Sequence, residues 1–317
     1  MAYTPTSEQM RGYERDGCFI ARGFVDAPSL DLIREGIGAG LDEDDSDAPW
    51  RRDGARADGA AIQGRERFRK IGQYARRDRG LWGAFLTHEN VTTVNRHFLG
   101  DDIRLWFDSV FTKPARIGEA TPWHQDIGLW TFHPAAKDRA PVYREALSIW
   151  LAVDPATKEN GCLQFVPGSH LGEVVPHVRY DDAIHAELPR ELVADIDPVH
   201  VELVPGDAVV WHAYAWHYSP PNDTGRNRWA ISCVTLREDA AREAELTQLP
   251  DWLWVGRRGR SEKACEPAHD VRSHRWIARA PCASVDRTYL VLAGFRLVRG
   301  RLPTRRSAFH TTPKANG

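Results

Sequence analysis

The sequence predicts a mostly β protein with flanking helices, built as a β-sandwich or jelly-roll barrel. Short apolar segments separated by Pro, Gly and Asn signals fill residues 103–236, a pattern typical of antiparallel sheets. Helical periodicity is concentrated in the first 100 residues, so the helices are expected to pack on one outer face of the barrel.

Composition excludes several classes of protein. The 317 residues are 42% hydrophobic and 27% charged, with a formal net charge of -2, a balance that argues against a nucleic-acid-binding protein. The N-terminus has no secretory signal and no apolar run is long enough to span a bilayer, so no membrane partner is expected. Five widely spaced cysteines favour a reduced, cytoplasmic protein.

Three helices are expected before residue 100. A capping box, in which Thr6 precedes Gln9 by three positions, predicts the first helix. Gly17 ends it, because glycine readily adopts the left-handed conformation of a helix C-terminus. The expected order is helix 6–16, strand 18–25, a helix capped by Asp26, a surface loop over 42–64 and helix 89–99.

The barrel strands are predicted from alternating or continuous apolar runs. Asn160-Gly161 is a strong hairpin signal, and Pro205-Gly206 marks a turn. Residues 171–198 carry little strand signal and are expected to cross the barrel mouth. The predicted strands are 103–113, 123–130, 147–153, 162–166, 199–204, 207–211 and 229–236.

Charge divides the chain near residue 255. From residue 256 onward, fourteen Lys and Arg stand against four acidic residues. We predict a single domain over 1–255, with a helical part over 1–100 and a barrel core over 101–240, followed by a basic extension, 256–317, of unknown role. The extension either folds against the acidic body or binds nucleic acid; its few interleaved aromatic residues disfavour the second reading.

The stretch around which the sequence is organised is Trp123-His124-Gln125-Asp126. In a β-strand, alternate side chains share a face, so His124 and Asp126 are expected side by side, about 6.6 Å apart at their Cα atoms. A second histidine, His217 or His212, would complete the two-His, one-carboxylate metal site of non-haem Fe(II) oxygenases. His-x-Asp also occurs by chance, so the rest of the chain must support the metal site.

Arg228 begins an apolar strand eleven residues after His217. An arginine that points into a barrel is costly unless an anion meets it. A dicarboxylic co-substrate would supply that anion, with one end chelating the metal and the other paired with the guanidinium. The alternative is a surface arginine at the edge of a strand.

Together these motifs resemble the phytanoyl-CoA dioxygenase family of Fe(II)/2-oxoglutarate oxygenases, over roughly residues 10–240. The resemblance implies a double-stranded β-helix, a cupin-like jelly-roll barrel. The matching pieces are His124-Gln125-Asp126, Trp150, Asn160-Gly161-Cys162-Leu163, Pro167-Gly168-Ser169-His170, Gly206-Asp207, His217, Ser219, Asn222 and Arg228.

The resemblance also implies roles for single residues and for cofactors. His124, Asp126 and His217 would hold Fe(II), which leaves His212 as a histidine that does not ligate. The co-substrate 2-oxoglutarate would be bound with O2, and its contacts would be Arg228 and Ser219 at the distal carboxylate, Trp150 along its length, and Ser109 and Lys70 elsewhere.

The implied substrate is a mid-sized, partly apolar small molecule, such as a secondary metabolite or a lipid-derived acid. A basic run that includes Arg65, Arg67, Arg69, Arg76 and Arg77 either binds the phosphates of a CoA thioester or is simply solvated. The alternative for most of the tryptophans is that they fill the core. The aromatic residues expected to line the substrate pocket are Trp106, Trp123, Trp130, Phe132, Trp211 and Trp216.

The implied reaction is hydroxylation coupled to the conversion of 2-oxoglutarate into succinate and CO2. Related halogenases replace the carboxylate that Asp126 provides, so its presence favours hydroxylation, with desaturation, epimerisation and ring formation as alternatives. Two other classes stay open: a non-catalytic metal- or ligand-binding barrel, and a cupin-type isomerase or dioxygenase that needs no 2-oxo acid. The sequence does not predict an oligomeric state.

Overall fold

The computed structural model describes residues 2–42, 51–53, 64–75, 78–130, 146–237, 253–256, 268–270 and 275–277. All of them belong to one compact unit, Met1–Ile277. Most of the expected loop at 42–64 and most of the basic extension lie outside the described residues, so a domain boundary at residue 255 stays a prediction. Within the described ranges, no helix has both the length and the apolar character needed to cross a membrane.

The N-terminal helices begin and end where the sequence predicts. Thr6 Oγ1 accepts a hydrogen bond from the Gln9 backbone N–H at 3.2 Å, and Gln9 Oε1 accepts one from the Thr6 N–H at 2.9 Å, which completes the capping box. Gly17 ends this helix with a φ of +83°. The helices of this part are α1 (Ser7–Asp16), α2 (Ala27–Asp42), α3 (Arg79–Leu81), the π-helical turn η2 (Trp82–Leu86) and α4 (Glu89–Leu99).

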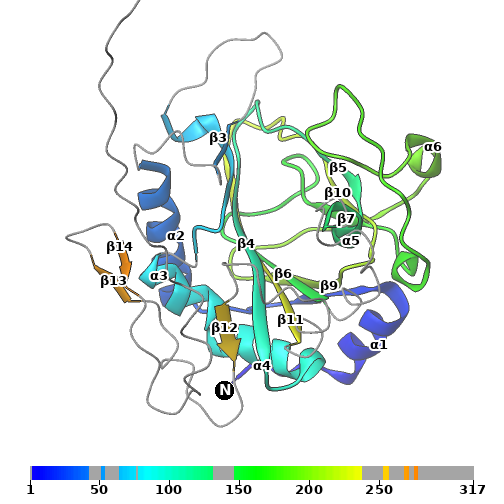
Figure 1. The fold of residues 1–317 in the computed structure, drawn as a ribbon. Coiled ribbons are helices and arrows are strands. Elements are labelled where there is room, and N and C mark those ends of the chain that lie inside the picture. The colour runs from blue at the N-terminus through cyan, green and yellow to red at the C-terminus, as the bar shows by residue number, and fades with distance from the viewer. Residues whose placement is uncertain are drawn as a thin grey trace, which may run out of the picture. The chain divides into compact units, whose positions relative to one another are not determined.

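The larger of two facing sheets has eight antiparallel strands (Figure 1). Strand β11 lies at its centre, between β6 and β4, so that Ser232 is opposite both Trp150 and Ser109. In sheet order the strands are β1 (Cys18–Ala21), β9 (Ala208–His212), β6 (Ala146–Ala152), β11 (Arg228–Arg237), β4 (Ile103–Lys113), β3 (Phe68–Gly72) and β2 (Arg51–Asp53), with β12 (Leu253–Gly256) also paired to β4.

Alternate residues of the large sheet pack into two different hydrophobic cores, one on each face of the sheet. On β6, Ile149 and Leu151 pack with the N-terminal helices, whereas Trp150 and Ala152 pack toward the small sheet. Helix α4 contacts β4, β6 and β11 on the first of these faces. The even-numbered positions of β6 and β11 therefore point into the space between the sheets, and the polar side chains of the site come from these positions.

The smaller sheet lies over the inner face of the large one, on the opposite side from α4 (Figure 1). Its order is β5 (Thr121–His124), β10 (His217–Ser219), β7 (Leu163–Phe165) and β8 (Val199–Val201). Strands that are close in the sequence, such as β9 and β10, thus belong to different sheets. This arrangement confirms the mostly β barrel with helices on one outer face.

Two local predictions are wrong. Residues 123–130 do not form one strand, because β5 ends at His124 and the short helix α5 (Asp126–Trp130) begins two residues later. The Asn160-Gly161 turn exists, with Gly161 at a φ of +82°, but it does not connect a hairpin. Strands β6 and β7, on either side of it, lie in different sheets, so the turn carries the chain from one sheet to the other.

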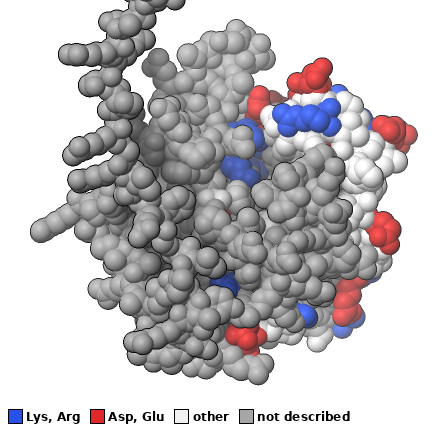
Figure 2. Space-filling view, in the orientation of Figure 1, with Lys and Arg blue, Asp and Glu red and all other residues white. Residues whose placement is uncertain are grey.

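The structure describes the side chains of only Arg65 and Arg69 in the basic run, so its role in binding phosphates stays a prediction. Arg65 donates to Asp42 in an exposed ion pair, with Nε 2.6 Å from Oδ1. The side chains of Arg67, Arg76 and Arg77 lie outside the described residues. Where Figure 2 shows described residues, basic and acidic side chains are interspersed on that face.

The junction between α1 and the barrel gives a test of packing. A Cβ on Gly17 would lie 2.6 Å from Nδ1 of His170, and the backbone there is left-handed. We expect Gly17→Ala to lower the free energy of unfolding by about 2 to 4 kcal/mol. The matched control is Gly23→Ala, at a φ of +56° with nothing within 4 Å, which should cost only about 1 kcal/mol. Equal losses in urea denaturation would contradict the role of the His170 contact.

Candidate metal centre and co-substrate site

The two histidines face each other across neighbouring strands. His217 on β10 is the register partner of His124 on β5, and their ring centroids are 4.0 Å apart. Both rings are nearly enclosed, at 4% and 5% exposure. The next residues along, Trp123 and Tyr218, point to the other face of the sheet, where their rings stack at 5.2 Å. Strand alternation therefore separates the inward imidazoles from an outward aromatic pair.

Each histidine is oriented by a backbone carbonyl two residues before it. Nδ1 of His124 is 2.7 Å from the Pro122 oxygen, and Nδ1 of His217 is 2.9 Å from the Ala215 oxygen. A carbonyl oxygen can only accept, so Nδ1 carries the proton in both rings and Nε2 keeps its lone pair. This is the tautomer that a metal ligand needs, with Nε2 pointing into the space between the sheets.

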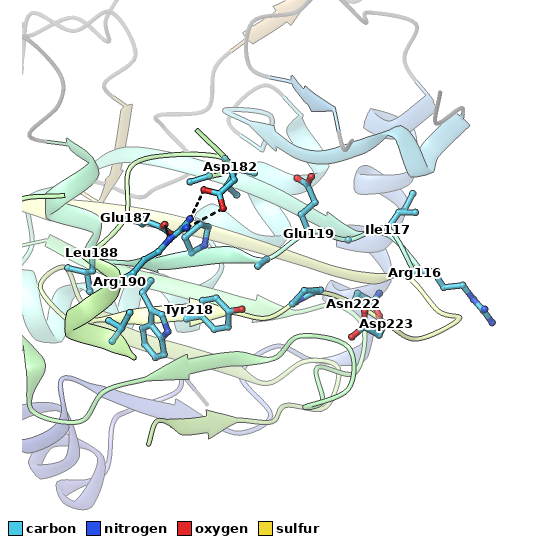
Figure 3. A pocket seen from close by; sticks show the side chains of 18 residues that line it. Arg116, Ile117, Glu119, Asp182, Glu187, Leu188, Arg190, Tyr218, Asn222 and Asp223 are labelled. Atoms are coloured by element: carbon cyan, nitrogen blue, oxygen red, sulfur yellow. Dashed lines mark hydrogen bonds and ion pairs between the residues drawn. The ribbon is translucent and has the colours of Figure 1, made fainter. Parts of the chain in front are cut away.

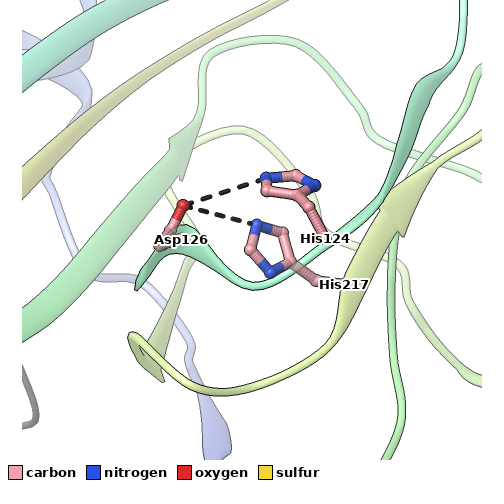
Figure 4. A group of neighbouring side chains, drawn as sticks. All are labelled: His124, Asp126 and His217. Atoms are coloured by element: carbon pink, nitrogen blue, oxygen red, sulfur yellow. Dashed lines mark ion pairs between the residues drawn. The ribbon is translucent and has the colours of Figure 1, made fainter. Parts of the chain in front are cut away.

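Asp126 completes the cluster from the first turn of α5. Its Oδ1 lies 3.8 Å from Nε2 of His124 and 3.7 Å from Nε2 of His217 (Figure 4). The three candidate ligand atoms all lie within 4.8 Å of one another, so a single cation placed among them can contact all three. Two imidazoles and one carboxylate on one side of a cation leave other coordination positions open.

The other oxygen of Asp126 is held by two donors from the large sheet. Ser148 Oγ donates to Oδ2 at 2.8 Å, and the Trp211 indole N–H donates to it at 3.0 Å. These bonds fix the carboxylate plane and leave Oδ1 for a metal, as partners of ligating carboxylates do. Trp211 therefore contacts a candidate ligand rather than only lining a pocket.

The electrostatics of the cluster favour a neutral imidazole at His124. Burial lowers the pKa of His124 well below its usual range, and the neighbouring His217 lowers it further. A histidine must be neutral to bind a metal, so this shift reduces the competition between protons and a cation.

The residue between the two ligands, Gln125, fixes the turn from strand to helix. Its side chain donates to the Tyr214 carbonyl at 3.0 Å and accepts from the Val175 N–H at 2.8 Å. Its backbone N–H donates to Nε2 of His177 at 3.0 Å. His177 uses Nδ1 on the Val175 carbonyl, so both of its nitrogens are occupied, and it supports the turn without being a ligand.

A buried, unpaired guanidinium lies at the other end of the site. Arg228 is 3% exposed, and its NH1 contacts the Gly161 carbonyl at 2.5 Å and Ser219 Oγ at 3.5 Å. Its Nε is sealed without a partner, and burial lowers its pKa to about 10. Among the described residues no carboxylate pairs with Arg228. A bound anion would therefore compensate the buried positive charge of its guanidinium.

Lys113 is a second buried cation at this end, and sequence reasoning missed it. It is the register partner of Arg228, and Nζ donates to Ser219 Oγ at 2.8 Å and to the Pro220 carbonyl. Burial, and then the charge of Arg228, lower the pKa of Lys113 well below its usual range. The sequence does contain a signal for Lys113. It ends an apolar strand and is four residues after Ser109, so the two side chains are expected on the same face of that strand.

The remaining expected co-substrate residues lie on the same inner face. The Arg228 guanidinium stands over the Trp150 ring at 5.1 Å. Ser109 Oγ is buried without a partner. Lys70, opposite Phe111 on β4, places Nζ 5.0 Å from that ring. The structure therefore brings all five expected residues to the inner face of the barrel, although their role as co-substrate contacts remains a prediction.

His212 lies on the other side of its strand. It follows Trp211 on β9, and since neighbours on a strand face opposite ways, its ring points away from Asp126. It packs instead beside His170 and Tyr13, with centroids 5.5 and 6.2 Å away, and its Nδ1 accepts from the Tyr214 N–H. His217 is thus the histidine that joins the cluster.

The aromatic residues expected around the substrate are dispersed. Trp106 packs against the small core that contains Ile127. Trp216 donates its backbone N–H to Ser169, while its indole nitrogen is sealed without a partner. The side chain of Trp130 and the whole of Phe132 lie outside the described residues.

Trp123 lines a different pocket, on the outer face of the small sheet. This pocket has a volume of about 770 Å³ and lies beside Tyr218, Arg190 and Glu119 (Figure 3). Arg190 is already paired with Glu187 and Asp182 there. Trp123 thus lies on the face of β5 opposite to His124, and its role as a substrate contact stays a prediction.

Comparisons with known proteins agree with this geometry. A "Probable phytanoyl-CoA dioxygenase" of Caenorhabditis elegans is 27% identical over 253 residues, covering 75% of this chain and 77% of its own. EctD from S. alaskensis, solved with 2-oxoglutarate and 5-hydroxyectoine, has a TM-score of 0.58 at 20% identity, covering 74% of this chain and 77% of its own. The epimerase SnoN, solved with Fe3+, alpha ketoglutarate and nogalamycin RO, has a TM-score of 0.54 at 20% identity, covering 73% of this chain and 82% of its own.

The fold and the His-Asp-His cluster are those expected of the oxygenases that bind Fe(II) through two histidines and one carboxylate. The family model of phytanoyl-CoA dioxygenase (PhyH) matches residues 13–230, which is more than half of the chain, and the chain belongs to this family. Other curated relatives are matched over only 49% and 40% of their own length. The substrates of these relatives are therefore not assigned to this chain.

The bond from Trp211 to Asp126 gives a test of the metal centre. Trp211→Phe removes the indole donor, so the carboxylate loses its orientation, and we expect the affinity for Fe(II) to fall about tenfold or more. Trp216→Phe is the matched control, because its indole nitrogen has no partner. Anaerobic calorimetric titration with Fe(II) measures both. An unchanged affinity in Trp211→Phe would show that this bond does not orient a ligand.

Proposed function

We propose that this protein hydroxylates a mid-sized, partly apolar small molecule, consuming 2-oxoglutarate and O2 and releasing succinate and CO2. His124, Asp126 and His217 are the proposed iron ligands. Iron bound there with 2-oxoglutarate supplies the oxidant for the substrate C–H bond. The protein contributes imidazoles that are oriented by backbone carbonyls, and it excludes water.

The observation that carries the proposal is the buried Arg228, which has no carboxylate partner among the described residues. Ser219, which contacts it, lies two residues after His217 on β10, about 6.6 Å along the strand. A dicarboxylate that chelates the metal at one end therefore has a guanidinium, a hydroxyl and the Lys113 ammonium near its other end. Charge-assisted bonds to a carboxylate would also satisfy the sealed Nε of Arg228.

The carboxylate of Asp126 favours hydroxylation over halogenation. It occupies the position beside the histidines and is hydrogen-bonded to Ser148 and Trp211, so a halide has no vacant place there. Epimerisation, desaturation and ring formation differ from hydroxylation in how the substrate is positioned relative to the metal. Mass spectrometry of the organic product distinguishes these reactions.

The proposal also includes the domain organisation, the cellular location and the type of partner. A single oxygenase domain over 1–255 is supported by β12, which extends the large sheet to Gly256. A cytoplasmic location is supported by the described cysteines, Cys18, Cys162 and Cys233, all of which are free thiols. The substrate is proposed to be a small molecule rather than nucleic acid or a membrane.

Binding of the co-substrate is tested by anaerobic titration with Fe(II) and then 2-oxoglutarate. We expect a weak visible charge-transfer band that appears only when both are present. Arg228→Gln should weaken 2-oxoglutarate binding about 100-fold, because a buried charge-assisted bidentate pair is lost, while Fe(II) affinity is retained. Arg226→Gln, an exposed arginine two residues away, is the matched control. A non-catalytic barrel would give no band in any variant.

Turnover is tested by succinate formation across candidate metabolites, with mass spectrometry of the organic product. Asp126→Ala should abolish succinate formation, because it removes one of three proposed ligands and leaves two imidazoles to hold the metal. Ser169→Ala, which alters a hydroxyl bonded to the Val166 carbonyl and the Trp216 N–H, controls for the loss of a local hydrogen bond. Unchanged turnover in Asp126→Ala would refute the ligand assignment.

A further inference from the structure

The segment from Val178 to Leu188 is attached to the edge of β5. Val178 and Glu187 exchange two backbone hydrogen bonds, at 2.7 and 2.9 Å, and the Leu188 N–H donates to the Trp123 carbonyl at 2.8 Å. Trp123 directly precedes the proposed ligand His124. The position of this segment relative to the metal cluster is therefore set by backbone bonds, although the sequence shows no strand pattern there.

These bonds place His185 against the metal cluster. Its ring lies 5.0 Å from that of His124, in an edge-to-face arrangement with an interplanar angle of 69°. It is not a member of the ligand cluster, which consists of His124, Asp126 and His217 within the described residues. His185 thus borders the candidate metal cluster from outside the ligand set.

The tautomer of His185 is fixed by its own loop. Nδ1 is 2.6 Å from the Ala186 carbonyl, and because that oxygen can only accept, Nδ1 carries the proton. Nε2 therefore presents a lone pair. In the described part of the chain Nε2 has no hydrogen-bond partner, and it is not one of the sealed unpartnered atoms, so it is open to a further donor.

The other histidines around the metal do not offer such an acceptor. His177 uses both ring nitrogens on backbone groups, and the Nε2 atoms of His124 and His217 point at Asp126. The nearby charged side chains, Arg69 and Lys70, are cations and can only donate. His185 Nε2 is thus the neutral acceptor that the described residues present beside the metal cluster.

We propose that His185 determines substrate specificity by accepting, through Nε2, a hydrogen bond from a hydroxyl or N–H group of the substrate. This inference rests on the proposed function and narrows its substrate class to partly apolar molecules that carry a donor close to the carbon that is oxidised. A substrate without that donor leaves the acceptor desolvated and unpaired, which is how a polar group in a pocket rejects an analogue.

The test uses the full chain loaded with Zn(II) and 2-oxoglutarate, which is diamagnetic and does not turn over. The probes are benzyl alcohol and benzyl methyl ether, which differ in one hydroxyl donor. By NMR titration we expect the wild type to bind the alcohol about three- to tenfold more tightly than the ether, the range for one net hydrogen bond. His185→Phe should bind both probes equally, and His185→Gln, which keeps an acceptor, should recover part of the preference.

A second readout follows the ring itself. In protein labelled with ¹⁵N-histidine, Nε2 of His185 should resonate as an unprotonated nitrogen and shift upfield with the alcohol but not with the ether. A protonated Nε2, a resonance that neither probe moves, or the same alcohol preference in wild type and His185→Phe would overturn the proposal. These spectra stay informative if a variant folds poorly, since they use the wild-type chain.

The co-substrate provides the remaining control. The affinity for 2-oxoglutarate, measured from the Fe(II) charge-transfer band, should be the same within about twofold in wild type and His185→Phe. A larger loss would make His185 a co-substrate contact and refute its role in specificity. Absence of the band in the wild type would instead refute the proposed function, so the two failures are distinguishable.

Discussion

The site depends on one constraint: the histidines on β5 and β10 are each held by the backbone carbonyl two residues earlier. Both bonds use Nδ1, so both lone pairs are on Nε2, and the register of β10 with β5 places the two rings opposite each other. His177 uses the same device, but a backbone N–H occupies its Nε2. All three rings thus have the same tautomer, and the group that faces Nε2 distinguishes the two proposed ligands from His177.

The barrel connects this metal cluster to the anion site through shared strands. Strand β10 carries His217 at one end and Ser219 at the other, while the large sheet supplies Ser148 to the carboxylate and Arg228 to the anion end. Lys113 and Arg228 are neighbouring buried cations whose described partners are carbonyls and a hydroxyl, an arrangement that is costly without an anion. The cost is consistent with a site built around a dicarboxylate.

Much of this could be predicted from the sequence, because motif spacing and apolar runs are local signals. Helix α4 and strand β4 have the predicted bounds, and His217 was preferred over His212. The two-residue spacing of His124 and Asp126 predicts that both lie on one strand. In the structure, Gln125 instead turns the chain into helix α5 through hydrogen bonds to Val175 and Tyr214, which are 50 and 89 positions away in the sequence. Strand alternation indicates the face on which Lys113 lies, but its pairing with Arg228 depends on the register of β4 with β11, and His185 lies in an irregular segment that has no periodicity.

The most direct measurement is an anaerobic crystal structure of the full chain with Fe(II) and 2-oxoglutarate. The account predicts one iron bonded to Nε2 of His124, Nε2 of His217 and Oδ1 of Asp126, with both Nδ1–carbonyl bonds intact and the distal carboxylate at Arg228. Iron bound elsewhere, or an ordered barrel in which Nε2 of His217 lies outside bonding distance of the metal, would contradict it.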